Sequence, residues 1–192
     1  VVLNKEATPD QVLKEHVDEV VIATGARPAI PKLRGLEKIC FSDAVDLLKG
    51  REAPGDSAVV LGGGLVGCET ALWLSRKGKE VVIVESLPHL MVGIFSITKH
   101  ALSERLFEAG VRIMTSTTVL EIFEDGVLAR SPEGVQPLRT SLLVAATGFE
   151  PDRRLLDGLQ DASFPVHAIG DCVKPRNIQH AIWEGFRLSL RI

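Results

Sequence analysis

The sequence predicts an α/β fold, and three of its features indicate this class. Apolar, β-branched runs of strand length alternate with segments of helical periodicity. A glycine-rich turn joins one of these strands to the helix after it, and three short runs separated by turn residues indicate an antiparallel meander. The chain has 192 residues, of which 45% are hydrophobic, so it is long enough to bury a core.

The first fifty residues contain short elements. Thr8 is followed by Pro9 and Gln11, a spacing typical of a helix start in which Thr8 is the N-cap and Gln11 closes a capping box. An apolar run then ends in the sequence Ala-Thr-Gly and is expected to be a buried strand. The expected elements are strands over 1–3 and 19–25 and helices over 9–16 and 42–48.

From Ser57 onward the pattern is strand, turn, helix and strand. Gly78 and Gly110 each end a helical segment, and a second Ala-Thr-Gly closes the last buried strand of this region. The expected elements are strands over 58–61, 80–85, 111–114 and 141–146, helices over 65–77 and 96–109, and the meander strands 117–123, 126–130 and 135–139.

The glycine turn has the full GxGxxG pattern, Gly62-Gly63-Gly64-Leu65-Val66-Gly67. Gly62 allows the sharp turn from strand to helix, and Gly64 lacks the Cβ that would keep a pyrophosphate from the backbone. Gly67 lets the helix lie close to the sheet. The unpaired N–H groups at the helix N-terminus attract an anion. The motif therefore predicts a Rossmann-like dinucleotide site, although a tight turn in an unrelated α/β protein is the alternative.

Glu85 closes the next strand, where an acid accepts hydrogen bonds from the adenosine ribose diol. Its charge would repel a 2′-phosphate, and the following residues, Ser86 to Pro88, supply no Arg or Lys to offset that repulsion. The sequence thus favours NADH over NADPH. Glu69, on the helix after the turn, is either a solvated residue or one that reaches the nicotinamide side.

A second candidate site follows a later apolar run. Gly170-Asp171 precedes a helix that is expected to start near Asn177 and Ile178. An Asp at this position is commonly a turn or cap residue. In the functional interpretation, Asp171 holds a ribityl hydroxyl of a flavin and the helix directs its positive end at the flavin ring.

Composition excludes several classes of function. The formal net charge is −3, which gives no electrostatic support for binding nucleic acid or a membrane surface. The three cysteines, Cys40, Cys68 and Cys172, are widely spaced and form neither a disulfide framework nor a metal-binding pattern. There is no signal peptide or spanning apolar run, so a cytoplasmic location is expected.

These motifs together resemble the two-dinucleotide-binding flavoproteins. More narrowly, "VIATGARP", "GGGLVGCETALWL" and "IGDCVKPRNIQHAIWEGF" are similar to the C-terminal FAD/NAD-binding half of NADH:flavin oxidoreductases of the 2,4-dienoyl-CoA reductase and trimethylamine dehydrogenase type. The positions that match the nicotinamide-side motifs are Gly62 to Gly67, Glu69, Glu85, Ser86, Thr147 and Gly148. Those that match the FAD-side motifs are Ala23, Thr24, Gly25, Gly170, Asp171, Asn177 and Ile178.

The resemblance implies an α/β, Rossmann-like three-layer β/β/α domain at 51–148, inserted in an incomplete FAD-binding domain made of 1–50 and 149–192. It implies the cofactors NAD(H) and FAD, with hydride passing from NADH to FAD. FMN and a 4Fe–4S cluster are expected only in an N-terminal TIM barrel, where an enoate- or dienoyl-CoA-like substrate would be reduced. The family's first glycine fingerprint is missing here, so the chain alone is expected to be inactive.

Two other functions stay open. One is the NADH oxidase or disulfide-reductase branch of the same fold, which would need a redox-active cysteine near the flavin. The other is a non-catalytic module that holds ADP or NAD. No residue of this chain is assigned a catalytic role, since hydride transfer needs orientation rather than an acid or base. A homo-oligomer is compatible with the sequence.

Overall fold

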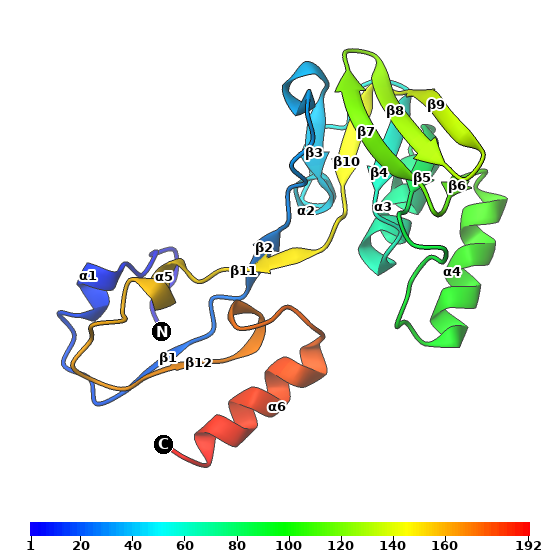
Figure 1. Ribbon diagram of the computed structural model, residues 1–192. Coiled ribbons are helices and arrows are strands. Elements are labelled where there is room, and N and C mark those ends of the chain that lie inside the picture. Colours follow the sequence, from blue (N-terminus) through cyan, green and yellow to red (C-terminus); the bar gives the residue numbers. More distant parts are fainter. The chain divides into compact units, whose positions relative to one another are not determined.

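The computed structural model describes residues 1–192 and divides into two compact units (Figure 1). The first unit comprises 1–27 and 149–192, and the second comprises 28–148. The sequence predicts a boundary near residue 51, but the segment 28–50 belongs to the second unit. The reason is that β3 (Phe41–Asp43) pairs with β10 (Leu142–Ala145) in the central sheet.

The second unit is built on a five-stranded parallel sheet with the order β3-β10-β4-β5-β6. The strand β4 (Ser57–Leu61) lies at its centre, β5 (Glu80–Val84) lies next to it, and β6 (Arg112–Met114) lies at one edge. The helix α3 (Leu65–Arg76) connects β4 to β5, and α4 (Ser96–Glu108) connects β5 to β6. Parallel neighbours require such crossover helices.

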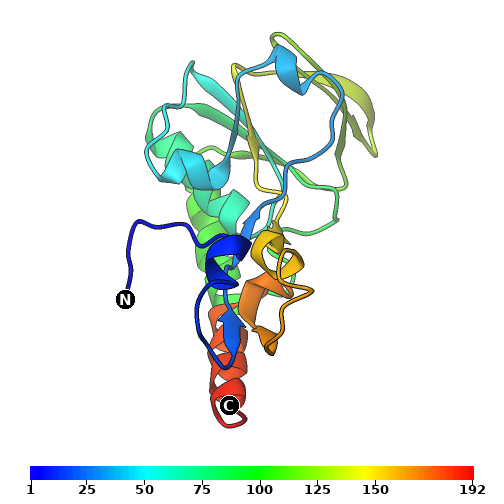
Figure 2. The same cartoon turned by 90° about the vertical axis from the view of Figure 1, so that its left-hand side faces the viewer.

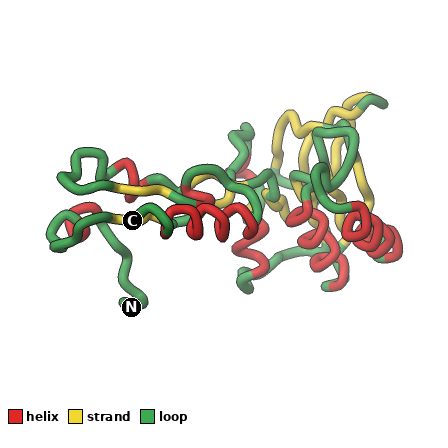
Figure 3. The backbone as a smooth tube through the Cα atoms, turned by 90° about the horizontal axis from the view of Figure 1, so that it is seen from below, coloured by secondary structure: helices red, strands yellow, loops and turns green.

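Helices and a second sheet cover opposite faces of this parallel sheet. The helix α2 (Ala44–Leu48) packs with α3 and α4 on one face, and Figure 3 shows the helices of this unit gathered on one side of its strands. The other face carries the antiparallel meander, which Figure 2 shows in yellow-green. The meander strands are β7 (Thr118–Phe123), β8 (Gly126–Ser131) and β9 (Gly134–Arg139).

Alternating side chains of β4 fill two cores. Ala58 and Val60 are buried among the residues of α2, α3 and α4, whereas Val59 and Leu61 are buried against the meander. This alternation is the period of two that a strand imposes. The unit is therefore a three-layer β/β/α domain, as the sequence predicts.

Two glycines of the turn allow β4 and α3 to approach closely. Gly62 has a φ of +103°, and a Cβ there would lie 2.4 Å from the carbonyl oxygen of Ala146. A Cβ on Gly67 would lie 2.0 Å from the carbonyl oxygen of Gly62. No other residue type fits at either position without moving the backbone.

The first unit has a smaller core, made by Ile22, Leu159 and Cys172. In it, β1 (Val20–Ile22) pairs in parallel with β12 (Val166–Ala168). A 3₁₀ turn at Gly170–Cys172 follows β12. The remaining elements are β2 (Ala26–Pro28), which pairs with β11 (Phe149–Pro151), and the helices α1 (Pro9–Val12), α5 (Arg154–Asp157) and α6 (Ile178–Ser189).

Some expected elements differ from the observed ones. The capping box between Thr8 and Gln11 is present, but α1 ends at Val12 rather than near His16. Residues 1–3 form no strand and are exposed, because no neighbouring strand pairs with them. The helix expected from Ser42 begins at Ala44, since the Asp43 side chain caps it.

We predict that Gly67→Ala lowers the free energy of unfolding of the second unit by about 3 kcal/mol, because the added methyl group meets backbone atoms that cannot move freely. Gly64→Ala is the matched control, since a Cβ there has no atom within 4 Å. It should cost about 1 kcal/mol or less. Urea unfolding followed by circular dichroism measures both, and equal losses would contradict the packing argument.

Candidate functional site

The N-terminus of α3 presents open backbone donors. Gly64 is the N-cap of this helix, is exposed, and has free space where a Cβ would lie. Cys68 N is the first amide of the helix to bond back, to the carbonyl of Gly64 at 3.0 Å. The amides between these two residues are the helix-end donors that have no intrahelical partner. The arrangement suits an anion that approaches at Gly64.

Glu85 lies beside this turn and is tied to it. Its Oε2 accepts a hydrogen bond from Gly63 N at 2.6 Å, and its Oε1 accepts from Leu87 N at 2.7 Å and Ser86 Oγ at 3.1 Å. The residue is 9% exposed. The carboxylate is therefore fixed at the carboxyl end of β5, next to the glycine turn, as a ribose-binding acid requires.

The loop after Glu85 also holds the turn, and the sequence did not predict this. Met91 N donates to the carbonyl of Gly63 at 2.8 Å. Met91 is 2% exposed and has a φ of +50°, a conformation that costs a non-glycine residue energy. The Leu90 side chain covers Gly63, where a Cβ would lie 2.3 Å from Leu90 Cδ2.

The other nicotinamide-side residues lie near the turn or on α3. Ala146 follows β10 directly and lies beside Gly62, so the next residues, Thr147 and Gly148, are brought to the same end of the sheet. Thr147 Oγ1 donates to the carbonyl of Ala29 at 2.7 Å. Glu69 is exposed in α3, and nothing observed distinguishes it from a solvated helix residue.

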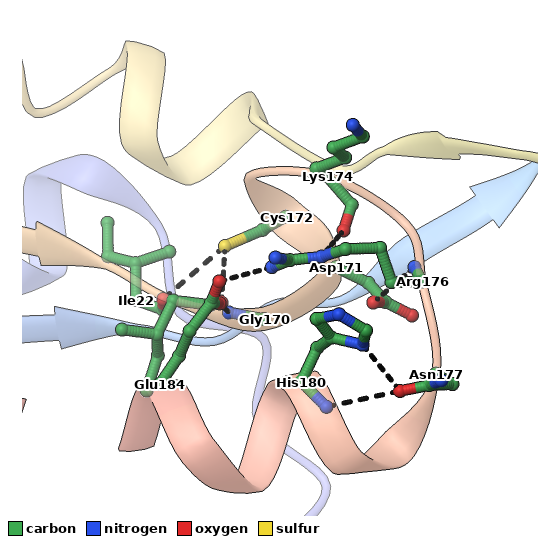
Figure 4. A network of polar contacts seen from close by, with 10 residues as sticks. Ile22, Gly170, Asp171, Cys172, Lys174, Arg176, Asn177, His180 and Glu184 are labelled. Atoms are coloured by element: carbon green, nitrogen blue, oxygen red, sulfur yellow. Dashed lines mark hydrogen bonds and ion pairs between the residues drawn. The ribbon is translucent and has the colours of Figure 1, made fainter. Parts of the chain in front are cut away.

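In the first unit, the second candidate site is the loop between β12 and α6. Asp171 Oδ1 accepts a hydrogen bond from Arg176 N at 3.0 Å. Asn177 is the N-cap of α6, and its side chain accepts from His180 N at 3.2 Å (Figure 4). Asp171 thus lies at the N-terminal end of α6, and Ile178 is the first residue of that helix.

The first Ala-Thr-Gly segment lies after β1 in the first unit. Ala23 and Thr24 are exposed, and Thr24 Oγ1 donates to the carbonyl of Asp152 at 2.7 Å. Gly25 has a φ of +76°, and its carbonyl accepts from Asp152 N at 3.0 Å. The neighbouring Arg154 guanidinium lowers the pKa of Asp152 to about 2.

Two of the three cysteines are buried thiols with structural contacts. Cys68 is fully buried, and burial, followed by the charges of Glu85 and Glu69, raises the pKa of its thiol to about 12. Cys172 is buried and donates to the carbonyl of Ile169 at 3.1 Å. A thiol is reactive as the thiolate, which the surroundings of Cys68 disfavour.

A family model described as pyridine nucleotide-disulphide oxidoreductase matches residues 1–185. The chain belongs to this family. It is an oxidoreductase domain whose cofactors are NAD(H) and FAD. Gly64 leaves room for a pyrophosphate beside Glu85, and Asp171 offers a carboxylate at a helix N-terminus.

Individual relatives agree with this family. The chain is 35% identical over 181 residues to an NADH oxidase of Thermoanaerobacter brockii, covering 91% of this chain and 28% of the relative. It is 29% identical over 194 residues to a cinnamate reductase of Clostridium sporogenes, covering 99% and 29%. The chain therefore spans less than a third of the length of these relatives.

A solved structure of a 2-naphthoyl-CoA reductase in complex with 2-naphthoyl-CoA has the same fold. The TM-score is 0.90 at 30% sequence identity, over 99% of this chain and 29% of that one. A histamine dehydrogenase from a Rhizobium species matches with a TM-score of 0.85 at 18% identity, over 97% and 32%, and supports the fold alone. Within the structure, no helix has the length and apolar character to cross a bilayer.

We predict that a thiol reagent modifies one cysteine rapidly in the folded chain and three after unfolding. Cys40 is exposed, whereas Cys68 and Cys172 are buried. Because the Cys68 pKa is about 12, its reaction should stay slow up to pH values well above neutral. Mass spectrometry of chain treated with iodoacetamide identifies the modified residues, and rapid labelling of Cys68 would contradict this.

Proposed function

We propose that this chain binds NADH in its second unit and takes part in passing a hydride from NADH to FAD. The observation that carries the proposal is the hydrogen bond between Gly63 N and Glu85 Oε2, which fixes an acid beside an open, anion-binding helix start. The second unit is then the NAD-binding domain, and the first unit is part of the FAD-binding domain.

The residues of the second unit would hold opposite parts of one dinucleotide. The N–H groups at the start of α3 would bind the pyrophosphate, to which the helix N-terminus contributes about half a positive charge. Glu85 would accept a hydrogen bond from the adenosine ribose diol. Its three observed hydrogen bonds leave room for a further one, because a carboxylate has about four acceptor positions.

The first unit would contribute two features to the flavin site. Asp171 would hold a ribityl hydroxyl, and the N-terminus of α6 would stabilise the negative charge that gathers on the flavin ring upon reduction. FAD supplies the hydride acceptor, and the protein supplies the orientation of the two cofactors. None of these steps requires an acid or base from this chain.

We propose an unsaturated, enoate- or dienoyl-CoA-like compound as the final electron acceptor of the longer protein. Support comes from relatives whose names specify such acceptors, the cinnamate reductase and the 2-naphthoyl-CoA reductase. A bilirubin reductase of Mediterraneibacter gnavus, 32% identical over 185 residues, is a further relative that is named as the reductase of an organic compound. The substrate would bind in an N-terminal barrel with FMN and a 4Fe–4S cluster, as the family resemblance implies.

An NADH oxidase is the second candidate, because one relative at 35% identity carries that name. In that case the reduced flavin would pass its electrons to oxygen. The disulfide-reductase variant is less well supported, since Cys68 and Cys172 are buried thiols with structural contacts. The three free cysteines suit a reducing compartment, and we place the protein in the cytoplasm.

Stopped-flow reduction of the full-length flavoprotein by NADH and by NADPH tests the proposal. We expect the flavin absorption band to bleach, with NADH effective at a lower concentration than NADPH. Glu85→Gln keeps an oxygen for Gly63 N but removes the charge that repels a 2′-phosphate. This variant should reduce the preference for NADH by about tenfold, or ~1.4 kcal/mol.

Two results would contradict the proposal. Tight binding of NADH without bleaching would indicate a non-catalytic nucleotide module, and an unchanged preference in Glu85→Gln would remove Glu85 from coenzyme selection. The fate of the electrons separates the two enzyme candidates. Turnover with cinnamate or an enoyl-CoA under nitrogen supports the reductase, whereas oxygen consumption alone supports the oxidase.

A further inference from the structure

One side chain from α6 holds both ends of the loop 170–177. Glu184 Oε2 accepts a hydrogen bond from Gly170 N at 2.7 Å, at the start of the loop. Glu184 Oε1 forms an ion pair with the guanidinium of Arg176, near the end of the loop. Figure 4 shows the carboxylate pointing from α6 toward both partners. The shape of the loop therefore depends on a residue that comes after it in the sequence.

Arg176 connects Glu184 to Asp171 through hydrogen bonds. Its backbone N donates to Asp171 Oδ1 at 3.0 Å, and its Nε donates to the carbonyl of Lys174 at 3.1 Å. The chain of contacts thus runs from Glu184 through Arg176 to the Asp171 carboxylate. The bond from Arg176 engages Oδ1, and the other oxygen, Oδ2, is the one that could accept a bond from a ligand hydroxyl.

Helical spacing and the burial of Gly170 explain why the Glu184 carboxylate lies at the loop and bonds Gly170 N. His180 and Glu184 are four residues apart on α6 and so lie on the same side of the helix, toward the loop. Gly170 is buried and has a φ of +71°, so its N–H needs an acceptor and its backbone shape suits glycine. The hydrogen bonds from the Arg176 side chain and then from Gly170 N lower the pKa of Glu184.

We propose that Glu184 and Arg176 are positioning residues for FAD, which fix Asp171 and the N-terminal end of α6 without contacting the flavin themselves. The inference rests on the proposed role of Asp171 in the flavin site. The inference extends that role. A carboxylate that accepts a hydrogen bond from one particular ligand hydroxyl must be held in a fixed position by the surrounding backbone. Loosening the loop should weaken FAD binding and reduce the stabilisation that the positive end of α6 gives to the reduced flavin.

The test uses the full-length flavoprotein, freed of FAD and titrated with it, and compares Glu184→Ala, Glu184→Gln and Arg176→Lys. Glu184→Ala should raise the Kd for FAD by about tenfold or more and shift the FAD midpoint potential to more negative values. Glu184→Gln should fall between this variant and wild type, because its amide oxygen can still accept from Gly170 N. Asp157→Asn is the matched control, since Asp157 forms an exposed pair with Arg153 in the same unit.

Several outcomes are distinguishable. A change in thermal stability with an unchanged Kd for FAD and an unchanged potential in Glu184→Ala would overturn the positioning role. Should Glu184→Ala not fold, as judged by a lost far-UV circular dichroism signal, Glu184→Gln and Arg176→Lys decide by the same two measurements. Asp171→Ala separates the two proposals. If it leaves FAD binding unchanged, the flavin site itself fails, whereas if it weakens FAD binding and Glu184 variants do not, only the positioning inference fails.

Discussion

The hydrogen bond from Gly63 N to Glu85 Oε2 is the contact on which the candidate NADH site depends. It joins the turn after β4 to the end of β5, and it is 2.6 Å long with an acceptor that is 9% exposed. A hydrogen bond to a charged group contributes about 1.5–3 kcal/mol. Met91 N donates to the carbonyl of the same glycine. The backbone N–H and C=O of Gly63 are therefore both hydrogen-bonded to residues that follow β5. The turn is therefore shaped before any ligand arrives.

A similar hydrogen bond occurs in each of the two units. In each, a glycine that follows a parallel strand donates its N–H to a carboxylate from a later element: Gly63 to Glu85, and Gly170 to Glu184. The two Ala-Thr-Gly segments are also alike, since Thr24 and Thr147 each donate a hydroxyl hydrogen bond to a backbone carbonyl far along the chain. Preformed sites of this kind lower the ordering cost of binding a large, flexible cofactor.

Local chemistry made part of this structure predictable. The turn at Gly62–Gly67 and the capping box at Thr8 are encoded by residues within a few positions of each other, and both are observed. Long-range contacts were not predictable in the same way. The strand β3 is formed by pairing with β10, which lies about 100 residues later in the sequence. No residue pattern near Met91 predicts its left-handed backbone conformation. Glu184 follows a helical pattern, and its role appears only when the fold brings Gly170 to it.

A crystal structure of the chain with bound NAD⁺ tests the central claim most directly. We expect the pyrophosphate within hydrogen-bonding distance of backbone N–H groups at the start of α3, and the adenosine ribose diol at Glu85, with the bond from Gly63 to Glu85 retained. A dinucleotide bound elsewhere, or a Glu85 side chain turned away from the glycine turn in the complex, would contradict it.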